Sequence, residues 1–178
     1  KTGFYWGYDY IFNLLVFTSL FFFYSIPFIL NKYSFEKFKN NIFEEKKKYL
    51  IILFFILSLI IFYDIPELQR SGGIFYKLSQ FTYVNLFYFF SLIGLIILFF
   101  LNDKNLQNLI IYLTLVLAFP FILIYQKYYD PLIYILLLTL INSKYLDELM
   151  NKKKININFF FIYYFFFLIG TNYYYFEN

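Results

Sequence analysis

Residues 11–30 read IFNLLVFTSLFFFYSIPFIL, and this stretch decides the fold. It is twenty residues long and contains no charged side chain. At about 1.5 Å per residue a helix of this length crosses the roughly 30 Å hydrocarbon core of a bilayer. The apolar residues run continuously, without the period-two alternation of an outer-membrane strand, so the stretch predicts a membrane-spanning α-helix.

Five more apolar segments follow along the chain. They cover residues 49–63, 83–101, 106–125, 131–146 and 157–171. With the first segment they predict an all-α fold, a polytopic transmembrane helix bundle of about six spans that forms a single domain over residues 1–178. Because the chain begins at Lys1 and its first residues lack a signal-peptide pattern, we expect it to be the C-terminal part of a longer protein.

The composition agrees with a membrane location and excludes several kinds of chemistry. Of the 178 residues, 62% are hydrophobic and 15% are charged, against about 45–50% and about 25% in soluble domains. The absence of Cys and His excludes disulfides, thiolate zinc sites, iron–sulfur clusters and imidazole catalysis. No nucleotide-binding loop is present, since Ser71-Gly72-Gly73 is too short. The sequence therefore gives no evidence of a cofactor, and it leaves open whether a divalent metal is bound.

The basic residues predict the orientation of the bundle. Eleven of the fifteen Lys and Arg residues lie in the loops 31–48, 102–105 and 142–156, and four lie in the alternate loops and the N-terminal segment. The positive-inside rule therefore places loops 31–48 and 142–156 in the cytoplasm and both termini on the other side. The same rule explains the net charge of +4 without a nucleic-acid partner.

Two loops on the predicted outer side differ from simple charge anchors. Residues 64–82, DIPELQRSGGIFYKLSQFT, combine a proline, two adjacent glycines and charges of both signs. After the glycines, four apolar residues follow at helical spacing, namely Ile74, Phe75, Leu78 and Phe81. They predict a short helix that lies in the membrane interface. Residues 126–132, QKYYDPL, form a polar hinge before the next span.

Charged residues in these loops are candidates for binding a phosphorylated substrate. Arg70, the single Arg of the chain, could bind a phosphate bidentately while the following glycine amides approach the same anion. The alternative is a glycine turn beside a solvated Arg. Lys127 could neutralise a lipid phosphate, and Asp130 could act as a base or bind a sugar hydroxyl. The alternative for Asp130 is a helix cap before Pro131.

Two further carboxylates could take part in catalysis. Asp64 and Glu67 are three residues apart near the end of a span, and paired carboxylates can divide the acid and base roles. The alternative is that both are solvated loop charges, because Pro66 between them disfavours a shared helical face.

The order of these features resembles a known family. A basic loop separates two spans over residues 11–63, an outer loop with Arg70 and Tyr76 follows, and Lys127-Tyr128 precedes Pro131 and an apolar span. This layout resembles the C-terminal part of the lipid-phosphate-glucose-dependent alpha-1,2-glucosyltransferases, which are multispan enzymes of the GT-C class. Lys127 stands where that family has an Arg.

The resemblance implies an integral membrane hexosyltransferase of glycan biosynthesis. It would transfer a sugar, such as glucose, from a polyprenyl-phosphate donor on the non-cytoplasmic face. The membrane would be a bacterial inner membrane or, in a eukaryote, that of the endoplasmic reticulum. The implied catalytic carboxylate belongs to the N-terminal part, with Asp64, Glu67 and Asp130 as alternatives. The residues that would bind the donor are Arg70, Tyr76, Lys77, Lys127 and Tyr128.

Two other functions remain open on the sequence. The first is a non-catalytic membrane subunit of a larger complex. The second is a transporter or lipid flippase, which commonly carries ionisable residues inside its spans. Segments 11–30, 49–63 and 106–125 contain no charged residue, and this disfavours a transporter.

Overall fold

The computed structural model describes residues 9–30, 32–66, 72–83, 85–102, 105–117, 129–151 and 155–177. These residues form helices and no strand, so the all-α prediction is confirmed. The helices are α1 (Tyr10–Ile29), α2 (Lys32–Glu44), α3 (Lys46–Phe62), α4 (Gly73–Phe81), α5 (Asn85–Leu101), α6 (Leu106–Leu117), α7 (Asp130–Ile135), the π-helical turn η2 (Leu136–Leu140), α8 (Lys144–Asn151) and α9 (Ile157–Glu177).

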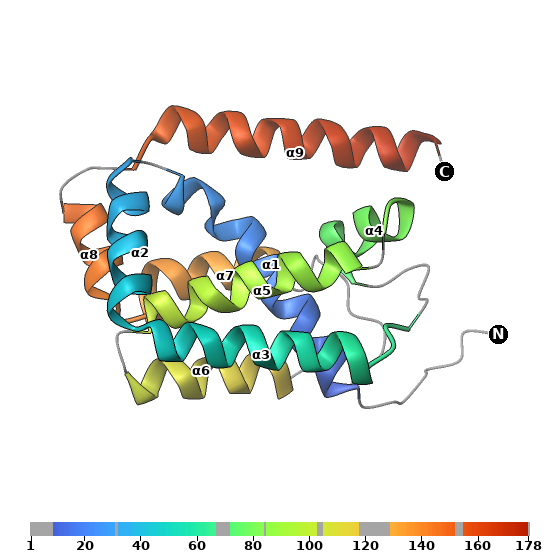
Figure 1. Ribbon diagram of the computed structural model, residues 1–178. Helices are drawn as coiled ribbons and strands as arrows, with labels where there is room; N and C mark the ends of the chain where they lie inside the picture. The colour runs from blue at the N-terminus through green and yellow to red at the C-terminus, as the bar shows by residue number, and fades with distance from the viewer. Residues whose placement is uncertain are drawn as a thin grey trace.

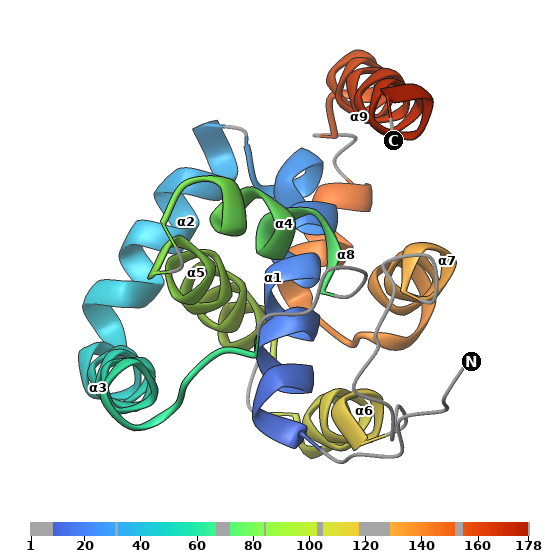
Figure 2. The same ribbon diagram turned by 90° about the vertical axis from the view of Figure 1, so that its right-hand side faces the viewer.

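The longer helices form a bundle with two distinct ends. In Figure 1, the axes of α3, α5, α6, α7 and α9 are roughly parallel, while α1 crosses the bundle obliquely. Helices α2 and α8 lie across one end, and α4 lies at the other. Seen from the α4 end in Figure 2, α1 occupies the middle, with α4 and α5 on one side and α6 and α7 on the other. Helix α1 is therefore the core around which the bundle is built.

Helix α1 is suited to this place because it is apolar on every side. Its buried residues run from Phe12 to Phe28, and α5 makes its most extensive helix contact. Among the described residues, α1 is the one helix that is long and apolar enough to cross a membrane. Helices α5 and α6, and α9 as far as Gly170, are apolar but shorter.

Small residues bring α1 and α5 close together. The Ser91 hydroxyl of α5 donates a hydrogen bond of 2.9 Å to the carbonyl of Leu15. One turn further on, Gly94 lies against the backbone of Thr18, where a Cβ atom would overlap the carbonyl oxygen. Close approach of two helices at small residues is the packing mode of membrane bundles.

Helix α9 docks where a proline interrupts the hydrogen bonding of α1. Pro27 has no N–H group, so the carbonyl of Phe23 lacks its usual helical donor. The hydroxyl of Tyr163 donates to this carbonyl at 3.2 Å, and the hydroxyl of Tyr164 donates to the carbonyl of Tyr24 at 3.4 Å. The adjacent tyrosines of α9 therefore recognise the proline-containing turn of α1.

Polar side chains fix the crosswise helices α2 and α8 to the end of α1. The carbonyl of Phe28 accepts hydrogen bonds from Tyr145 at 3.0 Å and from Ser34 at 3.2 Å. Lys37 of α2 pairs with Glu148 of α8 at 2.5 Å. Burial lowers the pKa of Lys37, but hydrogen bonds with Glu148 and Tyr33 outweigh this and raise it above its ordinary value. Lys37 is therefore protonated at neutral pH.

Helix α2 lies in loop 31–48, which we predict as a simple charge anchor. Between its charged residues, Ser34, Phe38 and Ile42 are spaced four residues apart, which is an amphipathic helical pattern. Ser34 is buried, and Phe38 and Ile42 pack against the core. The three residues share one face of the helix, and that face holds α2 against the bundle.

The segment predicted as a span over residues 131–146 is not one continuous helix. It consists of α7 and η2, an extended residue at Ile141, and the start of α8. The buried side chain of Asn108 explains the break, because it accepts a hydrogen bond of 3.0 Å from the Asn142 amide and donates one of 2.9 Å to the Asn142 carbonyl. Both backbone groups are therefore satisfied outside a helix.

Candidate functional site

The structure describes four of the eight residues that the sequence singles out. They are Asp64, Tyr76, Lys77 and Asp130. The other four, Glu67, Arg70, Lys127 and Tyr128, lie outside the described residues. The geometry of the site therefore rests on the α4 end of the bundle and on the start of α7.

A chain of hydrogen bonds joins three helices at the α4 end. The carboxylate of Asp9 accepts a bond of 2.9 Å from the amide of Phe12, which caps α1. Its other oxygen accepts a bond of 2.6 Å from the hydroxyl of Tyr63, which follows α3. The hydroxyl of Tyr88 in α5 donates to the carbonyl of Tyr63 at 2.5 Å. We call Asp9, Tyr63 and Tyr88 the end cluster.

Tyr76 is a packing residue as well as a hydrogen-bond donor. Its side chain is 1% exposed, with ring centres 5.3 Å from Phe12 and 5.2 Å from Phe87. Its hydroxyl donates to the carbonyl of Pro66. The predicted helix after the glycines is present as α4, but its buried face carries Tyr76 and Ser79, while Leu78 and Phe81 of the predicted apolar face are exposed.

The two glycines before Tyr76 form the turn that starts α4. Gly72 and Gly73 have φ values of 91° and 79°, in the left-handed region that favours glycine. A Cβ atom at Gly72 would overlap the ring of Tyr76, and one at Gly73 would lie 2.8 Å from a methyl group of Leu20. Both glycines are buried. Their contacts therefore favour a glycine turn that packs against Tyr76 over a role in binding an anion.

The charged residues of this loop lie nearer the surface. Asp64 is exposed on the extended segment after α3, close enough to Tyr88 for an electrostatic interaction. Lys77 of α4 is half-buried. Asp64 is therefore accessible at the α4 end, whereas Lys77 is partly covered.

Asp130 has a buried carboxylate oxygen without a hydrogen-bond partner. It is the first residue of α7, and this oxygen is its Oδ1 atom. It does not cap the helix, because the N-cap position belongs to Tyr129, so the capping alternative for Asp130 is wrong. Tyr129 is fully buried, with its ring 5.8 Å from that of Phe17. Burial raises the pKa of Tyr129, and its hydroxyl stays protonated at neutral pH.

The structure does not bring Asp130 and Tyr76 into one site. Tyr76 packs on Phe12 of α1, whereas Tyr129, next to Asp130, packs on Phe17. In Figure 2, α7 lies to the right of α1, whereas α4 lies over its upper part, away from α7. Asp130 instead lies close enough to Tyr164 of α9 for an electrostatic interaction.

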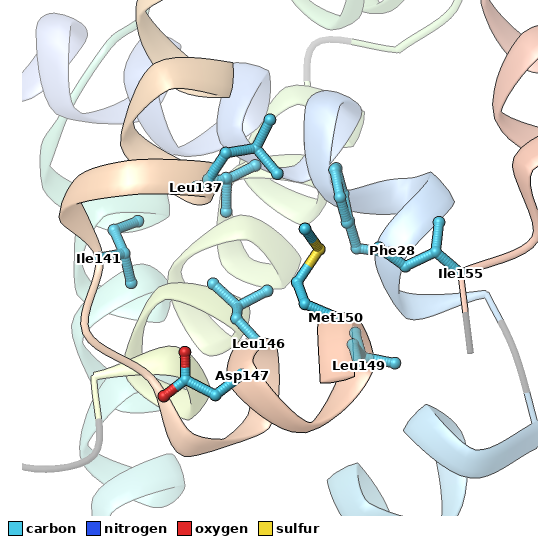
Figure 3. Close-up of a pocket in the computed structure, with 9 residues that line it drawn as sticks. Phe28, Leu137, Ile141, Leu146, Asp147, Leu149, Met150 and Ile155 are labelled. Carbon is cyan, nitrogen blue, oxygen red and sulfur yellow. The ribbon is translucent and has the colours of Figure 1, made fainter. Parts of the chain in front are cut away.

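A cavity at the opposite end of the bundle is too small to hold a substrate. It lies between the end of α1, η2 and α8, and Figure 3 shows apolar side chains around it, with the carboxylate of Asp147 at its edge. Its volume is about 40 Å³. Ligand pockets usually measure roughly 300–1,000 Å³, so this cavity has room for a few water molecules at most.

Sequence reasoning missed the end cluster. One signal could have revealed Asp9, because an Asp directly before a long apolar run is a typical helix N-cap. The partnership of Asp9 with Tyr63, 54 residues away, has no local signal. Within the described part of the chain, no group of three or more acidic residues lies close enough together to hold a metal ion.

No protein-family model, curated protein sequence or solved structure matches this chain.

Proposed function

We propose that this chain is an integral membrane protein whose bundle crosses the bilayer about six times. The proposal is carried by large apolar side chains that point away from the bundle. On α3, for example, Ile51, Phe54 and Ile61 are 69%, 74% and 73% exposed. Similar residues cover α6 and α9, among them Leu113, Phe161 and Phe166. Continuous apolar surface of this kind is stable in hydrocarbon and unstable in water.

The distribution of charge supports the same placement. Helix α3 begins with Lys46, Lys47 and Lys48 and then carries no charge as far as Phe62. Asp64 follows at the α4 end. In this arrangement the α2/α8 end faces the cytoplasm and the α4 end faces the other side.

Cysteine labelling tests this topology, and the chain contains no cysteine to interfere. In intact cells an impermeant maleimide should label Thr82→Cys at the α4 end and should label Glu36→Cys in α2 only after lysis. A cysteine at Phe54 should resist the reagent in both cases. Equal labelling of positions 36 and 82 before lysis would refute the topology.

We further propose that the bundle is the membrane part of a polyprenyl-phosphate-dependent glycosyltransferase. The observation that supports catalysis is the buried Oδ1 atom of Asp130, which accepts no hydrogen bond. Such a carboxylate is free to take the proton of an acceptor hydroxyl. The acceptor oxygen would then bond to the anomeric carbon while the bond from that carbon to the donor phosphate breaks, and polyprenyl phosphate would leave.

Asp130→Asn tests the catalytic part in the full-length protein. The substituted amide keeps the size of the side chain but cannot take a proton, so sugar transfer from a polyprenyl-phosphate donor should fall by about 10²-fold or more. Asp147→Asn is the matched control, because Asp147 is exposed at the opposite end. Equal activity of the two variants would refute the role of Asp130.

A non-catalytic membrane subunit is the second candidate function. The observation that favours it is Tyr76, whose ring is buried and whose hydroxyl binds the carbonyl of Pro66. These contacts give Tyr76 a structural role. Lys77 is then the described residue of α4 that is still a candidate for binding the donor. Full sugar transfer by a complex carrying both Lys77→Gln and Asp130→Asn would favour the subunit.

A further inference from the structure

Helix α2 has a second face that does not pack on the bundle. Phe35 and Phe43 are 68% and 58% exposed, and the exposed Lys39 lies one helical turn from each. The row continues into α3 with the exposed Lys46 and Lys47, and the Nζ atom of Lys46 lies 5.3 Å from the ring centre of Phe43. We call these five residues the α2 stripe.

The lysines of the α2 stripe differ in charge pairing from two neighbouring lysines. Two neighbouring lysines are neutralised by contacts with the fold, because Lys37 pairs with Glu148 at 2.5 Å and Lys48 with Glu45 at 2.8 Å. In the described part of the chain no ion pair is formed by Lys39, Lys46 or Lys47. The stripe therefore presents three cations and two aromatic rings to its surroundings.

The position of the stripe matches the boundary of a bilayer. Helix α2 lies across the end of the bundle in both views (Figures 1 and 2). It leads into α3, whose exposed apolar face begins at Leu50 and Ile51, directly after the lysines. If α3 crosses the membrane, Lys46 and Lys47 stand at the level of the lipid headgroups, and α2 lies along that surface.

We propose that the α2 stripe binds anionic phospholipids of the leaflet at the α2/α8 end. Phe35 and Phe43 insert at the boundary of headgroup and acyl chain, and Lys39, Lys46 and Lys47 bind lipid phosphates. A lipid surface is the occupant because aromatic and cationic side chains alternate along one row of a crosswise helix, as in interfacial helices that bind anionic membranes. The proposal rests on the membrane location proposed above and is independent of glycosyltransferase activity.

Native mass spectrometry of the full chain, released from nanodiscs of equimolar phosphatidylglycerol and phosphatidylcholine, tests this proposal. The unaltered chain should retain more phosphatidylglycerol than phosphatidylcholine. Each lysine removed from the stripe should lower the ratio by up to about fivefold, and the K39Q/K46Q/K47Q variant should retain the two lipids equally. K144Q, which removes an exposed lysine of α8 at the same end, should keep the preference.

Removal of nearby acidic residues should change the lipid preference in the opposite direction. Glu36 and Glu44 are exposed on α2 beside the stripe, so E36Q/E44Q should increase the retention of phosphatidylglycerol. An unchanged ratio in both K39Q/K46Q/K47Q and E36Q/E44Q would overturn the proposal. A protein partner would also overturn the proposal, if it binds the unaltered chain but not K39Q/K46Q/K47Q while the two chains retain lipids in the same ratio.

Insertion into the bilayer is measured separately in the same kind of nanodisc, where maleimide should react with Glu36→Cys and Thr82→Cys and should spare Phe54→Cys. A correctly inserted chain without lipid preference refutes the α2 stripe alone. A chain that fails to insert refutes the membrane location, and the stripe proposal falls with it.

Discussion

Replacing Gly94 by Ala should separate the two helices that form the centre of the bundle. A Cβ atom at this position would lie well inside 3.0 Å of the Thr18 carbonyl oxygen and 3.3 Å from the Cβ atom of Phe22. The Thr18 oxygen belongs to the backbone of α1, so it cannot turn aside as a flexible side chain can. The methyl group therefore fits only if α1 and α5 move apart, which also weakens the hydrogen bond from Ser91 to Leu15.

The magnitude follows from two opposing effects. Overpacking of a well-packed contact costs about 1–3 kcal/mol, and we expect the upper part of this range because backbone must move. Alanine regains about 1 kcal/mol over glycine within a helix. The net loss of unfolding free energy should be about 2 kcal/mol. Gly170→Ala is the matched control, since nothing lies within 4 Å of a Cβ atom there, and it should stabilise by up to about 1 kcal/mol.

Unfolding in mixed micelles measures both variants. The purified chain in dodecyl maltoside is titrated with sodium dodecyl sulfate, and loss of helix is followed by far-ultraviolet circular dichroism. Gly94→Ala should unfold at a lower mole fraction of the denaturing detergent than the unaltered chain, and Gly170→Ala at an equal or higher one. Equal midpoints for the two variants would refute the close approach of α1 and α5.

Two further predictions use the same assay. Tyr163→Phe removes the hydrogen bond to the Phe23 carbonyl and should lower the free energy of unfolding by about 1 kcal/mol. The loss should be smaller in a Pro27→Ala background, because the new amide at position 27 can donate to the same carbonyl. The same loss in both backgrounds would contradict the docking of α9 at the proline. Asn108→Ala removes two hydrogen bonds to the backbone of Asn142 and should destabilise by roughly 2–3 kcal/mol, which an unchanged midpoint would contradict.

The sequence predicts those parts of the fold that depend on local pattern. Residues 11–30 give the position of α1 to within one residue at each end, because an unbroken apolar run allows no other structure in a bilayer. The glycine pair before Ile74 gives the start of α4, because the left-handed turn requires residues without a side chain.

Features that depend on distant partners could not be predicted. The hydroxyl of Tyr63 finds the carboxylate of Asp9, and Asn108 binds the backbone of Asn142, 34 residues away. Neither pairing leaves a spacing that a sequence pattern detects. For the same reason the sequence gives no sign that Tyr76 packs on Phe12 of α1 whereas Tyr129, next to Asp130, packs on Phe17.

A chain so rich in Phe, Ile and Leu needs something besides apolar packing to fix which helix lies where, because apolar residues of similar size exchange neighbours at little cost. Here the backbone carbonyls of α1 supply that information. Leu15, Phe23 and Phe28 each accept a side-chain hydrogen bond, from α5, α9 and α8 respectively. Leu15, Phe23 and Phe28 are buried, so such a bond has no water to compete with, and a shifted helix would leave both donor and acceptor unsatisfied. Three bonds along one central helix therefore specify the register of three neighbours, while the aromatic side chains fill the remaining space.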